Sequence, residues 1–124
     1  MKSKRTNRYD SKLEASVASE YPQLERINSR QKPYTFTVTD TKGYNPDFIL
    51  PSGAYLEVKG YHAGLKEWIH LMRLLSIQYP NNGVKIFLER EVFVRGSKKL
   101  SAILRGYGFD VAIGEVPDEW LNSI

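Results

Sequence analysis

The segment from residue 47 to residue 59 places the tightest constraint on the fold, because its sequence fits two antiparallel strands joined by a short turn. Pro51, Ser52 and Gly53 are typical of a three-residue hairpin loop. Proline suits the first turn position, and glycine suits the left-handed position that closes the turn. A loop of this length sets the register of the whole hairpin. The predicted pairs are Leu50 with Ala54, Ile49 with Tyr55, Phe48 with Leu56, and Asp47 with Glu57.

In this register the two faces of the hairpin differ in character, since side chains alternate along a strand. The face that belongs on the core is wholly apolar and consists of Phe48, Leu50, Leu56 and Val58. The other face carries Asp47, Glu57 and Lys59. Directly opposed side chains have Cβ atoms about 4.5–5.5 Å apart, and like charges at that distance are destabilising.

Two facing carboxylates favour a cation between them. Mg²⁺ fits, because it is commonly held by one or two carboxylates together with water and substrate phosphate. Lys59 beside such an ion would stabilise charge on a phosphate oxygen or help to activate a water.

Two alternatives remain open on these residues alone. A two-residue loop of Ser52 and Gly53 would put Asp47 and Glu57 on opposite faces and would dissolve the cluster. In the second alternative the hairpin surface is solvated, Lys59 neutralises Glu57, and Asp47 only caps a turn.

Alternating helices and strands are predicted on both sides of the hairpin. Ser11-Lys12-Leu13-Glu14 matches a capping box, so a helix is expected from Ser11 until Tyr21-Pro22. Short strands are predicted at residues 24–27 and at residues 34–38, where Tyr34, Phe36 and Val38 alternate with threonines.

After the hairpin, apolar residues at three- and four-residue spacing predict a main helix over residues 65–79. A buried strand is expected at residues 84–88, then a basic loop and a helix around residues 100–104 that Gly106 or Gly108 closes. A strand at residues 109–113 and a turn or short helix after Pro117 follow. This order predicts one layered α/β domain.

Composition fits one globular domain with a polyanionic partner. The 124 residues are 41% hydrophobic and 26% charged, with a formal net charge of +4. That charge favours a nucleic-acid partner, although many basic proteins bind none. No cysteine is present, which excludes disulfides and cysteine nucleophiles. Because no apolar run reaches the roughly 20 residues of a membrane helix and no signal-peptide pattern opens the chain, a soluble cytoplasmic protein is expected.

Pro46-Asp47 followed by Glu57-Val58-Lys59 resembles the PD-(D/E)XK motif of restriction-endonuclease-like nucleases. Residues 44–53 and 57–60 more specifically resemble the phage endonuclease I family of junction-resolving enzymes. Further matches in order extend the resemblance over most of the chain from Leu13 onward: Gln78-Tyr79-Pro80, Gly96-Ser97-Lys98, Gly108-Phe109 and Pro117-Asp118-Glu119-Trp120. The resemblance implies a mixed central sheet flanked by helices, in one nuclease domain over residues 1–124 with a basic arm at about residues 1–10.

The resemblance also implies roles for individual residues. Asp47, Glu57 and the carbonyl of Val58 would bind one Mg²⁺, Glu14 would help to hold a second, and Mn²⁺ would substitute. Lys59 would support the attacking water or the pentacovalent phosphate. Glu14 thus has two interpretations, capping-box partner or metal ligand, and the fallback candidates are Glu20 and Glu25.

The implied function is a metal-dependent endodeoxyribonuclease that cleaves branched DNA such as a four-way junction, recognised by shape, in a phage-infected bacterial cell. The family acts as a homodimer with exchanged segments, and the stretch from residue 24 to residue 38 is the expected exchanged part. One alternative is a sequence-preferring nicking or homing endonuclease of the same fold. A second is a non-catalytic DNA-binding module.

Phosphate contacts are predicted for Lys4, Arg5, Arg8, Lys66, Arg73, Lys98 and Lys99. The four basic residues among the first eight form either a solvated terminus or an arm along the phosphates. The cluster from Arg90 to Lys99 is likewise either a solvated face or a phosphate-binding patch. His62 and His70 are expected to be exposed or partly packed, and the core is expected to include Trp68, Met72 and Tyr79.

Overall fold

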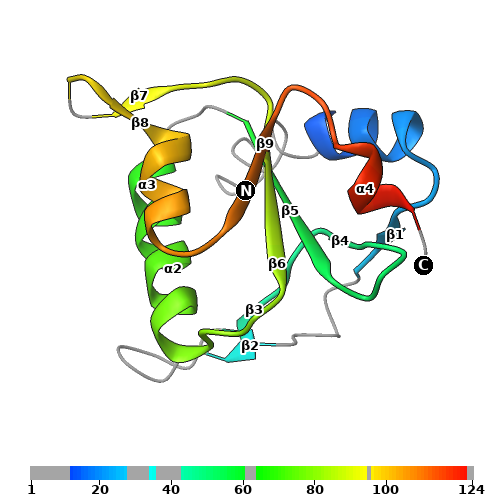
Figure 1. Cartoon of the computed structure of the whole chain (residues 1–124), viewed down its shortest axis with the longest axis horizontal. Coiled ribbons are helices and arrows are strands. Elements are labelled where there is room, and N and C mark those ends of the chain that lie inside the picture. Colours follow the sequence, from blue (N-terminus) through cyan, green and yellow to red (C-terminus); the bar gives the residue numbers. More distant parts are fainter. Residues whose placement is uncertain (1–11, 28–33, 36–42, 61–63, 95, 123–124) are drawn as a thin grey trace, which may run out of the picture.

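A five-stranded mixed sheet forms the centre of the computed structural model, which describes residues 12–27, 34–35, 43–60, 64–94 and 96–122 (Figure 1). In spatial order the strands are β1 (Glu25–Arg26), β4 (Phe48–Ile49), β5 (Tyr55–Lys59), β6 (Val84–Leu88) and β9 (Asp110–Ile113). β1, β4 and β5 pair antiparallel, whereas β5, β6 and β9 run parallel. The α/β class predicted from the sequence is confirmed.

The hairpin between β4 and β5 has the predicted register next to its loop, but the predicted pair of Asp47 with Glu57 lies outside the ladder, because the Asp47 amide donates to the Leu56 carbonyl. Phe48 pairs with Leu56 and Ile49 with Tyr55, and the Leu50 amide donates to the Ala54 carbonyl at 2.8 Å. Gly53 closes the loop with a φ of +94°, a left-handed conformation. The alternative two-residue loop is therefore wrong.

Substitution of Gly53 by alanine is expected to lower the free energy of unfolding by about 1 kcal/mol, because a Cβ is strained at a positive φ. No atom of the described part of the chain lies within 4 Å of that Cβ, so the effect would come from the backbone alone. Gly106→Ala in the last turn of α3 (Leu100–Gly106) is the matched control, since Gly106 has open space and no positive φ. Urea unfolding of both variants measures the difference, and equal stabilities would contradict the assignment.

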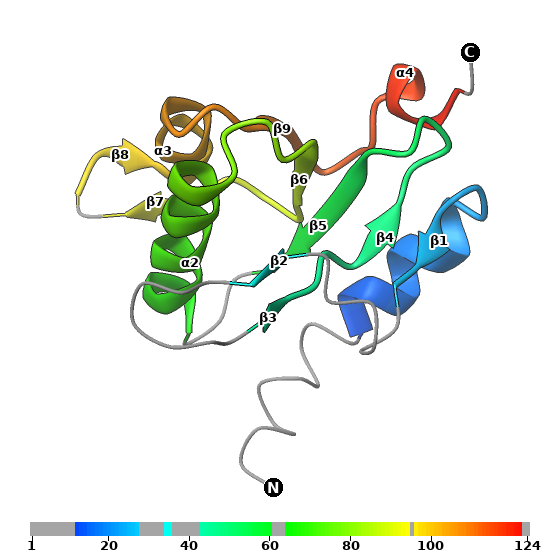
Figure 2. The same ribbon diagram turned by 90° about the horizontal axis from the view of Figure 1, so that it is seen from below.

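Helices cover both faces of the sheet (Figures 1 and 2). On one side lie α2 (Leu65–Gln78), which connects β5 to β6, and α3, which precedes β9. On the other side lie the helix formed by residues 12–20 and α4 (Asp118–Leu121). Helical crossovers of this kind are what parallel strands require.

Two hydrophobic clusters fill the spaces between the layers. Under α2 and α3 the sheet contributes Val84, Ile86 and Leu88 of β6. Towards the N-terminal helix and α4 it contributes the hairpin face predicted as core, namely Phe48, Leu50, Leu56 and Val58. The opposite hairpin face is also covered, because Glu57 and Lys59 are only 7% and 6% exposed. The alternative of a solvated hairpin surface is therefore wrong.

Several element boundaries differ slightly from those predicted. α2 ends at Gln78 with Tyr79 as its C-cap, and α3 ends at Gly106. Of the strand predicted at residues 34–38, Tyr34–Thr35 form β2, which pairs with β3 (Gly43–Tyr44), whereas residues 36–38 lie outside the described residues. β1 pairs with β4 within the same chain, and the exchanged dimer stays a prediction.

Three short strands were not predicted, namely β3, in a segment that reads as a polar turn, and the two strands that follow β6. The loop after β6 contains a short antiparallel ribbon of β7 (Phe93–Val94) and β8 (Lys98–Lys99). Strands of two residues are too short to show alternation, so the sequence carries no periodic signal for them. No helix in the described ranges is long and apolar enough to cross a membrane.

Candidate functional site

Asp47 is anchored to β5 at the open end of the hairpin. Its amide donates to the Leu56 carbonyl at 3.0 Å, and its carboxylate oxygen Oδ2 accepts a hydrogen bond from the Val58 amide at 2.8 Å. The Asp47 carbonyl in turn accepts from the Ile27 amide beside β1. The first two bonds fix Asp47 against β5, which carries Glu57, and the third links it to the segment beside β1.

Glu57 lies beneath α2, and two donors hold its carboxylate. The Tyr44 hydroxyl donates to Oε1 at 2.7 Å, and the Trp68 indole Nε1 donates to Oε2 at 2.9 Å. Burial raises the pKa of Glu57 from 4.5 to about 7, against the opposing effect of both donors and of the Lys59 charge. The carboxylate is therefore poised to change its protonation state near neutral pH.

Lys59 lies two residues beyond Glu57 on the same side of β5, and the same indole covers both side chains. Its Nζ is 5.4 Å from the centre of the Trp68 ring, within the range of a cation–π interaction. Its charge lowers the pKa of Glu57. One face of α2 thus covers a carboxylate and an ammonium group together.

Glu14 reaches the site from the N-terminal helix. Its Oε1 accepts a hydrogen bond from Arg26 of β1 at 2.9 Å, and its carboxyl group is close enough to Asp47 to raise the pKa of that residue. Burial raises the pKa of Asp47 well above its ordinary value, and the charges of Glu57 and Glu14 raise it further. Two carboxyl groups in such contact share a proton readily, because both cannot be ionised cheaply. The three acids therefore interact across the end of the hairpin.

The carbonyl of Val58 faces the same side as Asp47. The Tyr55 amide bonds to Gly83, and the Lys59 carbonyl accepts from Glu89, so the odd-numbered residues of β5 bond towards β6. The backbone groups of Val58 therefore point towards β4, where its amide donates to Asp47. Its carbonyl points the same way, because both backbone groups of one strand residue share a side.

The donor chemistry fits a hard divalent cation, although no three His, Cys, Asp or Glu side chains within the described ranges are already arranged to hold one. Oε1 and Oε2 of Glu57 each accept a hydrogen bond, and each oxygen has a second lone pair. Asn45, two residues before Asp47, has a buried Oδ1 that meets no hydrogen-bond donor among the residues that the structure describes. A buried acceptor of this kind needs a water, an ion or a ligand to satisfy it.

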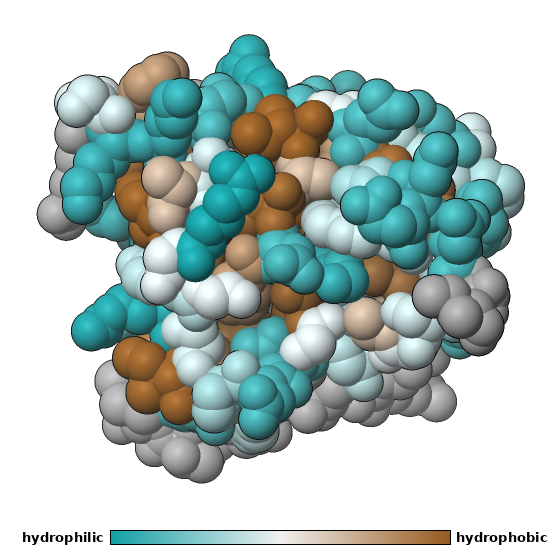
Figure 3. All heavy atoms as spheres, viewed as in Figure 1, coloured by the Kyte–Doolittle hydropathy of each residue, from teal (hydrophilic) through white to brown (hydrophobic). Residues whose placement is uncertain are grey.

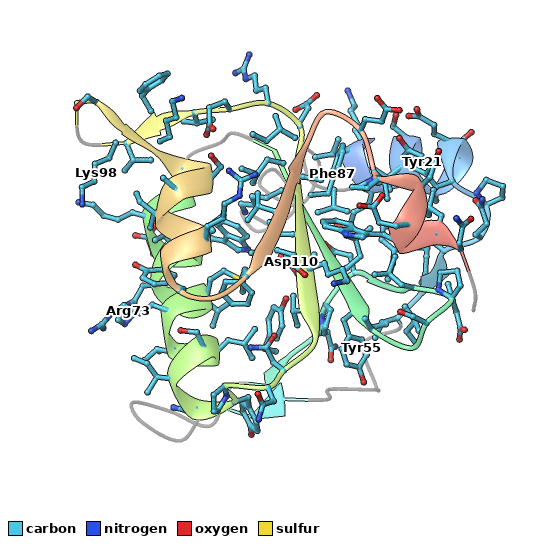
Figure 4. The ribbon with its side chains drawn as sticks, viewed as in Figure 1. Tyr21, Tyr55, Arg73, Phe87, Lys98 and Asp110 are labelled. Atoms are coloured by element: carbon cyan, nitrogen blue, oxygen red, sulfur yellow. The ribbon has the colours of Figure 1, made fainter. Side chains whose placement is uncertain are left out.

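The other predicted residues lie outside this cluster. Lys66 and Arg73 are exposed on α2, and Lys98 and Lys99 are exposed on β8. In Figure 4 the side chains of Arg73 and Lys98 point away from the molecule. His70 and the two fallback acids, Glu20 and Glu25, are exposed. Outside the described residues lie Lys4, Arg5, Arg8, Ser11 and His62.

Sequence reasoning missed the residues that position Glu57. Trp68 is buried as predicted, but it also donates its indole N–H to the carboxylate. From the sequence, Tyr44 stands out only as the first residue of the segment that resembles the junction-resolving enzymes. The available signal was that a buried Tyr or Trp normally finds an acceptor for its polar end.

The chain matches no model of a known protein family, and no curated protein is significantly similar to it. The chemistry of the site is therefore inferred from its own residues.

Proposed function

We propose that the protein is a metal-dependent endodeoxyribonuclease that cleaves phosphodiester bonds in branched DNA. The observation that carries the proposal is the convergence of Glu14, Asp47 and Glu57 beside Lys59 at one end of the hairpin. Burial and neighbouring acids raise the pKa of Asp47 and of Glu57, which costs stability, and such perturbed groups are concentrated at functional sites. The resemblance to PD-(D/E)XK nucleases supports the same assignment for the same residues.

The chain's own side chains divide the work of the proposed reaction. When bound, Mg²⁺ or Mn²⁺ would activate water and stabilise the leaving oxygen. Asp47, Glu57 and the Val58 carbonyl would hold one ion, and Glu14 would help to hold a second. Tyr44 and Trp68 keep the Glu57 carboxylate in place, as their hydrogen bonds favour its charged form. The Lys59 ammonium would stabilise negative charge on the phosphate in the transition state.

Several features support DNA, and branched DNA in particular, as the substrate. The net charge of +4 and the exposed lysines of β8 favour a polyanion. The mixed sheet with helices on both faces is compatible with a restriction-endonuclease-like fold. The resemblance to junction-resolving enzymes supports a four-way junction and a homodimer, which would place two sites on one branched molecule.

The test is cleavage of a synthetic four-way junction with Mg²⁺ or Mn²⁺, compared with a linear duplex made of the same arms. We expect the junction to be cut faster, and Asp47→Asn to lower the rate about 100-fold, because it removes a negative charge and keeps the acceptor for Val58. Glu119→Gln on the exposed α4 is the matched control.

Other results of this cleavage assay would favour one of the alternative functions or contradict the proposed site. Cutting of the linear duplex as fast as the junction would favour a nicking or homing endonuclease. Junction binding with no metal-dependent product would favour a non-catalytic module. Full activity of Asp47→Asn would contradict the proposed site.

A further inference from the structure

The β7–β8 ribbon presents an exposed aromatic ring beside a lysine. Phe93 pairs with Lys99 and Val94 with Lys98, and directly opposed residues share a face of the ribbon. Val94 is partly buried and packs against the core cluster under α3. Phe93 on the opposite face is 60% exposed. The outer face of the ribbon therefore consists of Phe93 and Lys99.

Hydrogen bonds to α3 hold the base of the ribbon and engage the carboxylate of Glu91. The Leu100 amide donates to the Val92 carbonyl at 2.8 Å. The carboxylate of Glu91 accepts hydrogen bonds from both the amide and the hydroxyl of Ser101, which lower its pKa. The carboxylate of Glu91 thus points towards α3, whereas Lys98 and Lys99 are exposed on β8.

The ribbon starts at the same end of the sheet as the candidate site. The Glu89 amide donates to the Lys59 carbonyl at 3.1 Å, and Arg90 and Glu91 lead from there to β7. The ribbon then projects beyond α3 (Figures 1 and 2). DNA that lies along the ribbon would therefore extend towards the end of β5 that carries the acids.

A shallow, open hollow lies next to Phe93. It has a volume of about 320 Å³ and is lined by Arg90, Glu91, Val92 and Phe93. Apolar side chains at this end of the molecule are surrounded by hydrophilic ones (Figure 3). Single exposed apolar residues are common on protein surfaces, and Ile77 on α2 is one of them. Phe93 differs because a flat ring, a cross-strand lysine and a hollow coincide.

We propose that the β7–β8 ribbon is a DNA-docking element in which Phe93 stacks on an unpaired base while Lys99, on the same face, binds a neighbouring phosphate. Stacking of bases on aromatic side chains beside basic residues is how proteins commonly bind single-stranded nucleic acid. The choice of DNA rests on the proposed function. The inference deepens that function, because it makes an unpaired base near the branch a feature of the substrate.

The experiment measures binding in EDTA, so that cleavage plays no part. The probe is a branched DNA with 2-aminopurine, a fluorescent base, unpaired next to the branch. Wild-type protein is expected to quench the probe, and Phe93→Ala is expected to abolish quenching and weaken binding about tenfold, since one stacked base contributes roughly 1–3 kcal/mol. Phe93→Trp should restore both, and Ile77→Ala is the matched control for loss of an exposed apolar side chain.

The salt dependence tests the lysine separately. Lys99→Gln is expected to reduce the slope of log K against log salt by about 1, as one phosphate contact is lost. Binding and quenching by Phe93→Ala that equal those of the wild type would overturn the inference. So would a dimer that dissociates in Phe93→Ala, because a second copy would then cover the ring.

Failure of this inference can be told apart from failure of the proposed function. Metal-dependent cleavage with no effect of Phe93 on binding would leave the nuclease proposal standing and refute the docking element. Phe93-dependent binding without any cleavage by the wild type would support the docking element and refute the nuclease.

Discussion

The Glu57→Gln variant is expected to lose DNA cleavage by at least about 10³-fold while becoming more stable than the wild type at pH 8. In the metal-free protein an ionised Glu57 is buried, which raises its pKa from 4.5 to about 7. Glutamine is nearly isosteric and uncharged. Its oxygen can accept from the Trp68 indole, and its amide can donate to the Tyr44 hydroxyl oxygen, so the buried hydrogen bonds are kept.

The sign of the pH dependence follows from proton binding. Between about pH 4.5 and pH 7 folded Glu57 holds a proton that the unfolded chain has released, so the stability present below pH 4.5 is lost as the pH rises to 7 and above. A rise from 4.5 to about 7 corresponds to a loss of up to about 3 kcal/mol. Glu57→Gln does not titrate and escapes this loss.

Thermal unfolding of both proteins in EDTA at pH 4 and pH 8 measures the difference. The variant should melt roughly 10 °C higher at pH 8, and the gap should close at pH 4. Mn²⁺ should raise the melting temperature of the wild type more than that of the variant, because Glu57 is a proposed ligand. Glu119→Gln on α4 should change neither quantity. A variant that is less stable than the wild type at pH 8 would show that the carboxylate stabilises the metal-free fold.

The hairpin could be predicted from sequence because its register depends on local chemistry. Pro51 and Gly53 fit one loop length, and that length fixes the pairing of Phe48 with Leu56 and of Ile49 with Tyr55. The alternation of apolar side chains then identified the core face correctly. The local sequence did not show that the face with Glu57 and Lys59 is also covered.

That cover comes from a distant part of the chain. Trp68 belongs to the helix that follows the hairpin, and its indole reaches back to both Glu57 and Lys59. The spacing of apolar residues predicts that Trp68 faces inward, but not that its N–H meets a carboxylate. Glu14 poses the same problem over a longer separation, since its link to Asp47 depends on how the N-terminal helix packs on the sheet.

Lys59→Met is expected to reduce the cleavage rate about 10²- to 10³-fold, with DNA binding largely kept. Methionine retains an unbranched apolar side chain that packs well on the Trp68 ring, so the substitution removes the charge and keeps that contact. Because the Lys59 charge lowers the pKa of Glu57, its loss raises that pKa further. The residual activity should therefore require a higher pH than the wild type does, which a rate profile from pH 6 to pH 9 would measure.

Lys85→Met is the matched control, since Lys85 also lies 5.4 Å from the centre of an indole ring, that of Trp120, but outside the acid cluster. It should cleave at the wild-type rate with an unshifted profile. Lys59→Arg restores the charge with a different shape, so it separates charge from geometry. Equal profiles for Lys59→Met and the wild type would mean that Lys59 only fills space under α2, and the charge-stabilising role would then have to be abandoned.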